Sequence, residues 1–287
     1  MKALNSFFLA ILTVLIFAPG KAAAYQEIEV KNGGTIQGRA TIKGEMPSPR
    51  VYHLVLFPNI EMCSKVDTDN EMNRMLDDFI VGENNGLKDV IITIEHVDAG
   101  KPFSDETKKS IPIKSENCKF FPDVNVIQQG GAFTVDNKDS VMHNSQVYQS
   151  ERGKILVNIP IPAEEISDGT VQFQKDYKIF QMICGMHEFM QTWGFRIQNP
   201  YHFQTAENGA FKIDGIPPGD YVVNAWHYLM KMQSRKVHIS ENSAVDLDFE
   251  FNGDQVVRPL YETIKSGRIK KDAKGRIHSL NKISHER

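Results

Sequence analysis

The sequence predicts an all-β protein, built as a Greek-key sandwich followed by a small second β-sandwich. Short segments of alternating apolar and polar residues recur along the chain, and turn residues separate them. Their regular spacing between residues 34 and 197 is typical of a Greek-key sandwich. The pattern starts again after Asn199-Pro200, which indicates a second module.

The alternation places the individual strands. In the first module, strands are expected at residues 34–42, 52–57, 87–96, 124–126, 132–135, 141–148, 154–159, 170–173, 177–184 and 192–197. In the second module they are expected at residues 209–213, 221–227, 237–239 and 245–251. The acidic stretch 66–81 differs, because its apolar residues recur at helical spacing, so a short surface helix is predicted there.

The N-terminus has the features of a secretory signal peptide. Lys2 precedes an apolar run from Phe7 to Phe17, and the small residues 22–24 offer a cleavage site. Residues 1–24 are therefore expected to be removed on export. The alternative, a retained membrane anchor, fits less well because the run is shorter than the ~20 apolar residues of a bilayer span.

Charge is distributed unevenly along the chain. The net charge is −3, but residues 258–287 hold nine Lys/Arg against three Asp/Glu, so the tail carries +6 and the rest −9. We interpret residues 254–287 as a basic tail that either docks on an acidic partner or is a solvated end. The acidic body gives no reason to expect nucleic acid as a partner.

The three cysteines of an exported chain are best explained by one disulfide and one spare thiol. Cys63 and Cys118 are the natural pair, and closing that long loop contributes on the order of 4 kcal/mol in the loop-entropy account. The alternative, two free thiols, is disfavoured by export. Cys184 then remains for another role.

Cys184 opens the strongest chemical signal, the run Cys184-Gly-Met-His187-Glu-Phe-Met190 between two predicted strands. A thiolate, an imidazole and a thioether suit copper when one more histidine joins them, whereas zinc more often recruits further Cys or His. His143, at the start of a predicted strand, is the candidate for that fourth ligand. In the alternative interpretation no metal is bound: Cys184 is an ordinary buried thiol, His187 is a surface residue and Met190 fills space in the core.

These residues resemble the cupredoxin (blue-copper) family. The Cys184, His187, Met190 spacing is similar to the short ligand loop of amicyanin and plastocyanin type, and the Asn-x-Asp-x-x-x-His143-Asn144 stretch is similar to the upstream histidine motif. The resemblance implies one type 1 copper ion with His143, His187 and Cys184 as equatorial ligands and Met190 as axial ligand. It implies a hydrogen bond from Asn144 near the thiolate. It covers about residues 25–198, with the predicted helix as an insert.

The second module, residues 199–253, resembles the carboxypeptidase regulatory-like, transthyretin-type β-sandwich. The resemblance rests on the segment GAFKIDGIPPGDYVVNAWH, in which a Gly-aromatic strand, a Pro-Gly turn and a Tyr-containing strand follow one another. Such modules usually pack against other domains or present a surface, and they seldom catalyse. His227 at its end either faces a metal or substrate or, as we prefer, is a structural histidine.

The resemblance implies a periplasmic protein that carries single electrons between redox proteins and is not an enzyme, because no position is left open for a substrate. His187 is then the expected exposed edge for electron transfer, beside Met186, Phe189 and residues 160–162. The alternative is a periplasmic copper-storage or delivery protein that uses Met142, Met182, Met186 and Met190 as soft ligands. No membrane span is expected after signal cleavage.

Overall fold

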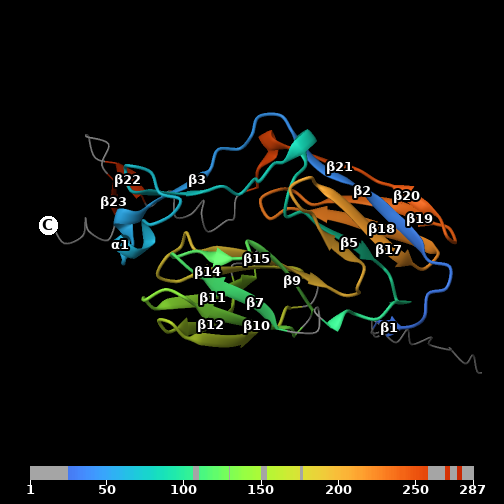
Figure 1. Cartoon of the computed structure of the whole chain (residues 1–287), viewed down its shortest axis with the longest axis horizontal. Coiled ribbons are helices and arrows are strands. Elements are labelled where there is room, and N and C mark those ends of the chain that lie inside the picture. Colours follow the sequence, from blue (N-terminus) through green and yellow to red (C-terminus); the bar gives the residue numbers. More distant parts are fainter. Residues whose placement is uncertain are drawn as a thin grey trace, which may run out of the picture.

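The computed structural model describes residues 25–105, 110–128, 130–149, 154–174, 177–257, 269–271 and 277–279. Its regular secondary structure is almost all strand (Figure 1), which confirms the predicted all-β class. Its helical pieces are α1 (Ile60–Cys63) and the 3-10 turns η1 (Leu54–Leu56), η2 (Glu83–Asn85) and η3 (Gly253–Gln255). No helix among these residues has the length and apolar content of a membrane span. The predicted signal peptide and most of the basic tail lie outside the described residues.

The strands from β7 to β15 form a two-layer sandwich, called here the site sandwich (residues 111–197). One sheet has the order β13-β10-β7-β8 and the other the order β12-β11-β14-β15-β9. In chain order the strands are β7 (Ile111–Ser115), β8 (Phe120–Phe121), β9 (Val124–Gln128), β10 (Ala132–Asn137), β11 (His143–Gln149), β12 (Lys154–Ile161), β13 (Ile166–Thr170), β14 (Ile179–Cys184) and β15 (Gln191–Ile197). Their inward side chains, such as Phe120, Phe133 and Phe180, form one core.

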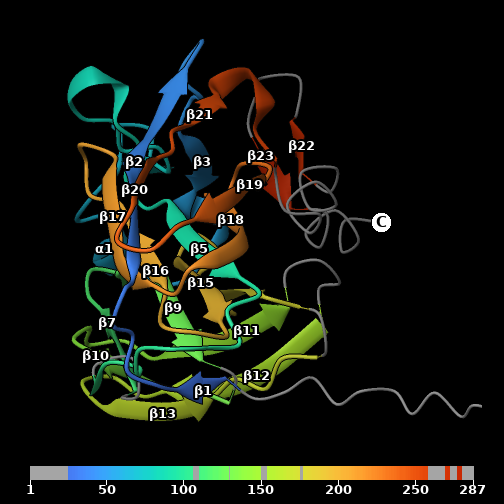
Figure 2. The same ribbon diagram turned by 90° about the vertical axis from the view of Figure 1, so that its right-hand side faces the viewer.

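A second sandwich lies beside the first (Figure 2) and also has two sheets. One has the order β16-β5-β18-β19, and in the other β2 pairs with β17, β20 and β21. The strands are β2 (Gly34–Lys43), β5 (Ile91–Glu95), β16 (His202–Gln204), β17 (Ala210–Ile216), β18 (Gly219–Trp226), β19 (Gln233–Ile239), β20 (Ala244–Asp246) and β21 (Phe249–Asn252). Two further pairs are small: β1 (Gln26–Glu27) with β6 (Ala99–Gly100), and β22 (Ile269–Lys271) with β23 (Ile277–Ser279).

The predicted domain boundary at residue 198 does not separate the two sandwiches. Strand β2 pairs with β17, and β5 pairs with both β16 and β18, although β2 and β5 were predicted to belong to the copper domain. Residues 199–253 alone lack both of these central strands. The site sandwich is therefore an insertion within the second sandwich, and periodicity could not show this because it identifies strands without identifying their partners.

The two sandwiches share a buried apolar interface. Every residue of β15 is buried, because one face meets the site core and the other meets β18. The Phe195 and Trp226 rings lie 5.2 Å apart, and the Trp193 and Tyr228 rings stack at 5.5 Å. Burial of such large rings stabilises the contact between the two sandwiches.

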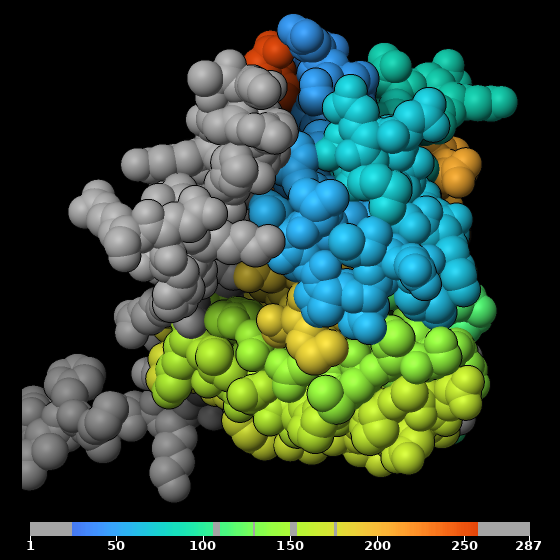
Figure 3. Space-filling model, turned by 90° about the vertical axis from the view of Figure 1, so that its left-hand side faces the viewer, coloured from blue at the N-terminus to red at the C-terminus, as the bar shows by residue number. Residues whose placement is uncertain are grey.

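Residues 50–76 form a cap over one end of the site sandwich, where Figure 3 shows them in blue to cyan against the green strands. The cap contains β3 (Arg50–His53), η1, α1 and β4 (Asn73–Leu76), and β3 pairs with β4. The helix predicted over residues 66–81 is therefore wrong. The Asp69 carboxylate accepts hydrogen bonds from the backbone N–H groups of Glu71 and Asn73, so a turn forms where the helix was expected.

A disulfide joins Cys63, at the end of α1, to Cys118, in the connection between β7 and β8. Both residues are fully buried. Beside it, the buried Arg74 of β4 donates hydrogen bonds of 2.8 Å to the carbonyls of Asn117 and Cys118. The cap is thus attached to the site sandwich by one covalent bond and by a buried guanidinium.

The shared sheets generate a prediction for residues 25–198 produced alone. Without residues 199–257, β2 and β5 lose their strand partners, so we expect amide protection in residues 34–43 and 91–95 to fall to that of an unfolded chain. The paired strands β11 and β14 should stay protected. Hydrogen exchange read by NMR, with the full chain as control, tests this, and retained protection of β2 would contradict the shared-sheet arrangement.

Candidate metal centre

His143 is placed by the alternation of β11, which buries every second residue from His143 to Gln149. Strand β11 lies between β12 and β14, and its Ser145 pairs with Cys184 at the end of β14. His143 and Cys184 consequently lie at the same end of two neighbouring strands. The backbone N–H of Asn144 donates to the Cys184 sulfur at 3.4 Å.

The connection from Cys184 to Met190 is a tight loop closed by its own backbone. The N–H of His187 donates to the Cys184 carbonyl (3.2 Å), and that of Met190 donates to the His187 carbonyl (2.8 Å). A side chain at Gly185 would displace the Asn144 side chain, because a Cβ there would lie 2.5 Å from the Asn144 side-chain oxygen. The loop therefore folds His187 back toward Cys184.

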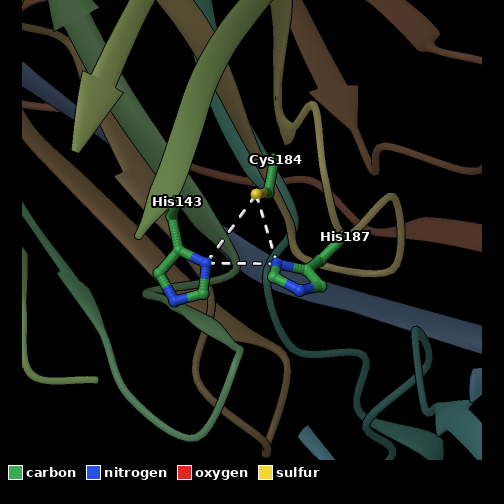
Figure 4. A group of neighbouring side chains, drawn as sticks. All are labelled: His143, Cys184 and His187. Atoms are coloured by element: carbon green, nitrogen blue, oxygen red, sulfur yellow. Dashed lines mark hydrogen bonds between the residues drawn. The ribbon is translucent and has the colours of Figure 1, made fainter. Parts of the chain in front are cut away.

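Three donor atoms converge at this point (Figure 4). The Nδ1 atoms of His143 and His187 are 3.2 Å apart, and the Cys184 sulfur lies 3.8 and 3.6 Å from them. The centre of such a triangle is about 2 Å from each atom, which matches metal–nitrogen and metal–sulfur bonds of ~2.0–2.3 Å. The residues fit a single metal ion bound by two imidazoles and a thiolate.

The outer nitrogen of each imidazole has its own partner. His143 Nε2 lies 2.8 Å from a carboxylate oxygen of Asp139, and His187 Nε2 lies 3.2 Å from the carbonyl oxygen of Pro58. Because both partners are acceptors, each Nε2 carries a proton and donates it. Both Nδ1 atoms therefore point at the centre, where they face the Cys184 sulfur in the metal-free protein and are the atoms that would bind a metal, the arrangement found for histidine ligands in metal sites.

The cluster is fully buried, and its hydrogen bonds decide its charges. Burial by itself raises the pKa of Cys184, but hydrogen bonds from His143, His187 and the Asn144 backbone outweigh it and lower the pKa to about 6. Burial likewise lowers the pKa of His143, yet the bonds to Asp139 and Cys184 raise it to about 9. The cluster therefore favours the thiolate, the form of cysteine that binds metals.

Asp139 is a member of the site that sequence reasoning did not single out, although it stands inside the quoted histidine motif. Its carboxylate accepts from the backbone N–H groups of Asn117 (2.6 Å) and Cys118 (2.9 Å) as well as from His143. Burial alone raises the pKa of Asp139, but these bonds lower it. Its position four residues before His143 was the available signal, since a carboxylate commonly orients a ligating imidazole.

The remaining predicted residues take different positions. Met190 is fully buried in the same core cluster, next to the start of β15. The Asn144 side chain donates to Asn158 and to the carbonyl of Ile159, so its contact with the thiolate is made by the backbone instead. His227 is buried between the rings of Phe79 and Tyr228, as a structural histidine would be.

The expected exposed edge at His187 is wrong. His187 is 0 % exposed and Phe189 2 % exposed, because the cap covers both. The Phe57 ring packs edge-on against Phe189 at 5.1 Å, and the Arg74 guanidinium lies 5.2 Å from the centre of the same ring. The burial of His187 and Phe189 could not be inferred from the ligand loop, because the contacts that cover them come from residues more than one hundred positions earlier.

No protein family model and no curated protein matches the chain. Solved structures match part of it. Copper-containing nitrite reductase from Thermus scotoductus is 16 % identical over 31 % of this chain and 23 % of its own length, with a TM-score of 0.27. This chain thus spans about a quarter of that protein.

Two smaller solved proteins are matched over nearly their whole length. A purple cupredoxin from Nitrosopumilus maritimus is 20 % identical over 31 % of this chain and 100 % of its own, with a TM-score of 0.26. Amicyanin from Paracoccus versutus is 15 % identical over 37 % of this chain and 97 % of its own, with a TM-score of 0.27.

The buried carboxylate generates a prediction for Asp139→Asn. The amide presents one acceptor oxygen to groups that bind two carboxylate oxygens, so the free energy of unfolding should fall by about 3 kcal/mol. Urea denaturation of the metal-free protein measures this. The matched control is Asp136→Asn, whose partly exposed carboxylate pairs with Lys138 and should change stability by less than about 0.5 kcal/mol. Equal losses would show that Asp139 has no special role.

Proposed function

We propose that this protein carries single electrons through one copper ion held by His143, Cys184 and His187, with Met190 as the axial ligand. The observation that carries the proposal is the triangle of two imidazole nitrogens and one thiolate sulfur, which is sized for one ion. Two histidines and one cysteine with a weak thioether are the donors of blue-copper electron-transfer sites. When bound, the copper supplies a one-electron couple between its two oxidation states.

The donor set favours copper over zinc. Structural zinc sites complete a tetrahedron with strong Cys or His ligands, whereas among the described residues the group around Cys184 has two histidines and no second free cysteine. Cys118, which also lies near His143, is held in the disulfide. The soft sulfur of the buried Met190 is suited to copper.

The surroundings favour electron transfer over substrate chemistry. Both imidazoles are oriented by fixed acceptors, and the backbone N–H of Asn144 is directed at the sulfur. Side chains held in this way need little rearrangement when the charge of the ion changes. The cap excludes water from His187, so no open position for a substrate is left on that side.

Electrons then enter or leave through the cap. Pro58, whose carbonyl accepts from His187, lines an open groove of about 690 Å³ together with residues 57–62, Lys65 and Val141. Exposed Val55 and Met142 add apolar surface near it in sequence. A partner redox protein docked in this groove would contact Pro58, which is hydrogen-bonded to His187, so the path for the electron is short.

Copper storage or delivery is the second candidate, and one observation favours it: Met142 is 48 % exposed next to the ligand His143. An exposed thioether is a soft surface ligand. Met182 and Met190, however, are fully buried in the core. The four methionines therefore do not form one exposed binding surface.

Export to the periplasm is part of the proposal. It rests on the N-terminal sequence pattern and on the buried disulfide, since disulfides persist in oxidising compartments. Redox proteins of that compartment are then the natural donor and acceptor.

The electronic signature of the thiolate is the first test of this function. We expect the copper-loaded, oxidised protein to show an intense visible thiolate-to-copper absorption, because the Cys184 sulfur would be one of the donors that hold the ion. Cys184→Ser should abolish the band while Met182→Leu, which changes a buried methionine elsewhere in the same core, should keep it. Copper binding without this band would eliminate the electron-carrier proposal.

Copper stoichiometry separates the two candidate functions. We expect one tightly bound copper per chain, and we expect Met142→Leu to leave this number unchanged, since Met142 does not belong to the triangle. Equilibrium dialysis followed by metal analysis measures it. Several copper ions per chain, with a loss on Met142→Leu, would instead support storage.

A further inference from the structure

The two ends of the disulfide lie next to the two acceptors that orient the candidate histidine ligands. Cys118 donates its backbone N–H to Asp139 at 2.9 Å, and Asp139 accepts from His143. On the other side, Cys63 ends the single helical turn that follows Pro58, the acceptor for His187. One covalent bond therefore connects the supports of both imidazoles.

The path from Cys63 to Pro58 is short and stiff. The backbone N–H groups of Met62 and Cys63 both donate to the Asn59 carbonyl at 3.0 Å. A shift of Cys63 must therefore move Asn59 and the adjacent Pro58 carbonyl. The path from Cys118 to Asp139 is a direct hydrogen bond, so a shift of Cys118 moves the carboxylate.

The same cap shields the thiol. Cys184 is the one cysteine outside the disulfide, and it is buried. A free thiol in an oxidising compartment is open to oxidation wherever solvent and oxidants can reach it. The His187 imidazole lies between the Cys184 sulfur and the cap carbonyl of Pro58, and the cap residue Phe57 packs on the neighbouring Phe189.

We propose that the Cys63–Cys118 disulfide is a positioning element of the metal centre, which fastens the cap over His187, fixes the acceptors of both histidines and protects Cys184 before metal binds. This goes beyond the general stabilisation expected of any disulfide. It rests on the proposed function in taking the two histidines as ligands. Its test uses metal-free protein, so its failure is distinguishable from a failure to bind copper.

The test is the rate at which iodoacetamide alkylates Cys184 in the folded, metal-free protein. In the wild type Cys184 is the free thiol, and in the double variant Cys63→Ala/Cys118→Ala it is the sole cysteine, so mass spectrometry reads one site in both. We expect the variant to react at least about tenfold faster, because loss of the tether favours opening of the cap. The Nε2–H proton of His187 should also exchange faster with solvent by NMR.

The matched control is Val171→Ala, a cavity-forming change in the core of the same sandwich that touches neither acceptor. Val171→Ala should accelerate the alkylation of Cys184 only as far as its lower stability increases the fraction of unfolded protein. If the double variant reacts no faster than Val171→Ala at equal stability, the disulfide only stabilises the fold in general and the proposal is wrong.

A second variant keeps the test decisive should the double variant not fold by circular dichroism. Pro58→Gly leaves the disulfide intact and frees the backbone of the acceptor for His187. We expect faster alkylation of Cys184 and faster exchange at His187 Nε2–H, with exchange at His143 unchanged. Unchanged rates of Cys184 alkylation and of His187 Nε2–H exchange would contradict the proposed role of the cap.

Discussion

The pairing of Ser145 with Cys184 between β11 and β14 is the constraint on which the rest of the site depends. Strand alternation turns His143, two residues before Ser145, to the same buried side, and the end of β14 delivers the sulfur beside it. A shift of one residue in this register would turn His143 out to the opposite face. The loop to Met190 then needs only two tight turns to bring His187 to the same point.

Local features of the sequence singled out three side chains that the structure brings together, and their role as metal ligands stays a prediction. The Cys184, His187, Met190 spacing lies in one loop, so its geometry is decided within seven residues, and the structure does bring His143, Cys184 and His187 together. The axial role of Met190 stays a prediction. The all-β class was equally accessible, because alternation is a short-range signal.

Features that depend on distant contacts were not accessible. The apolar spacing in residues 66–81 imitates a helix, but the Asp69 turn and the pairing of β4 with β3 override it. The boundary at residue 198 failed because the sheet partners of β2 and β5 come from the far end of the chain. The burial of His187 depends on Pro58, 129 positions earlier, which no periodicity can reveal.

The buried polar groups of the site are linked to one another by hydrogen bonds, which give the buried carboxylate and the thiolate their donors. The Asn117 and Cys118 amides, the Asp139 carboxylate, the His143 imidazole and the Cys184 sulfur are linked in that order. A buried carboxylate and thiolate without such donors would be strongly destabilising. The same hydrogen bonds that make burial tolerable therefore also fix the directions of the metal donors.

The insertion of one sandwich into the other has a consequence for how the chain acquires its structure. Strands β5 and β16 pair with each other, yet residues 96–201 separate them along the chain. A folded site sandwich shortens the flexible part of this long loop, and it thereby lowers the entropy cost of pairing β5 with β16. Completion of the sheets of the second sandwich is therefore linked to the folding of the site sandwich inserted between its strands.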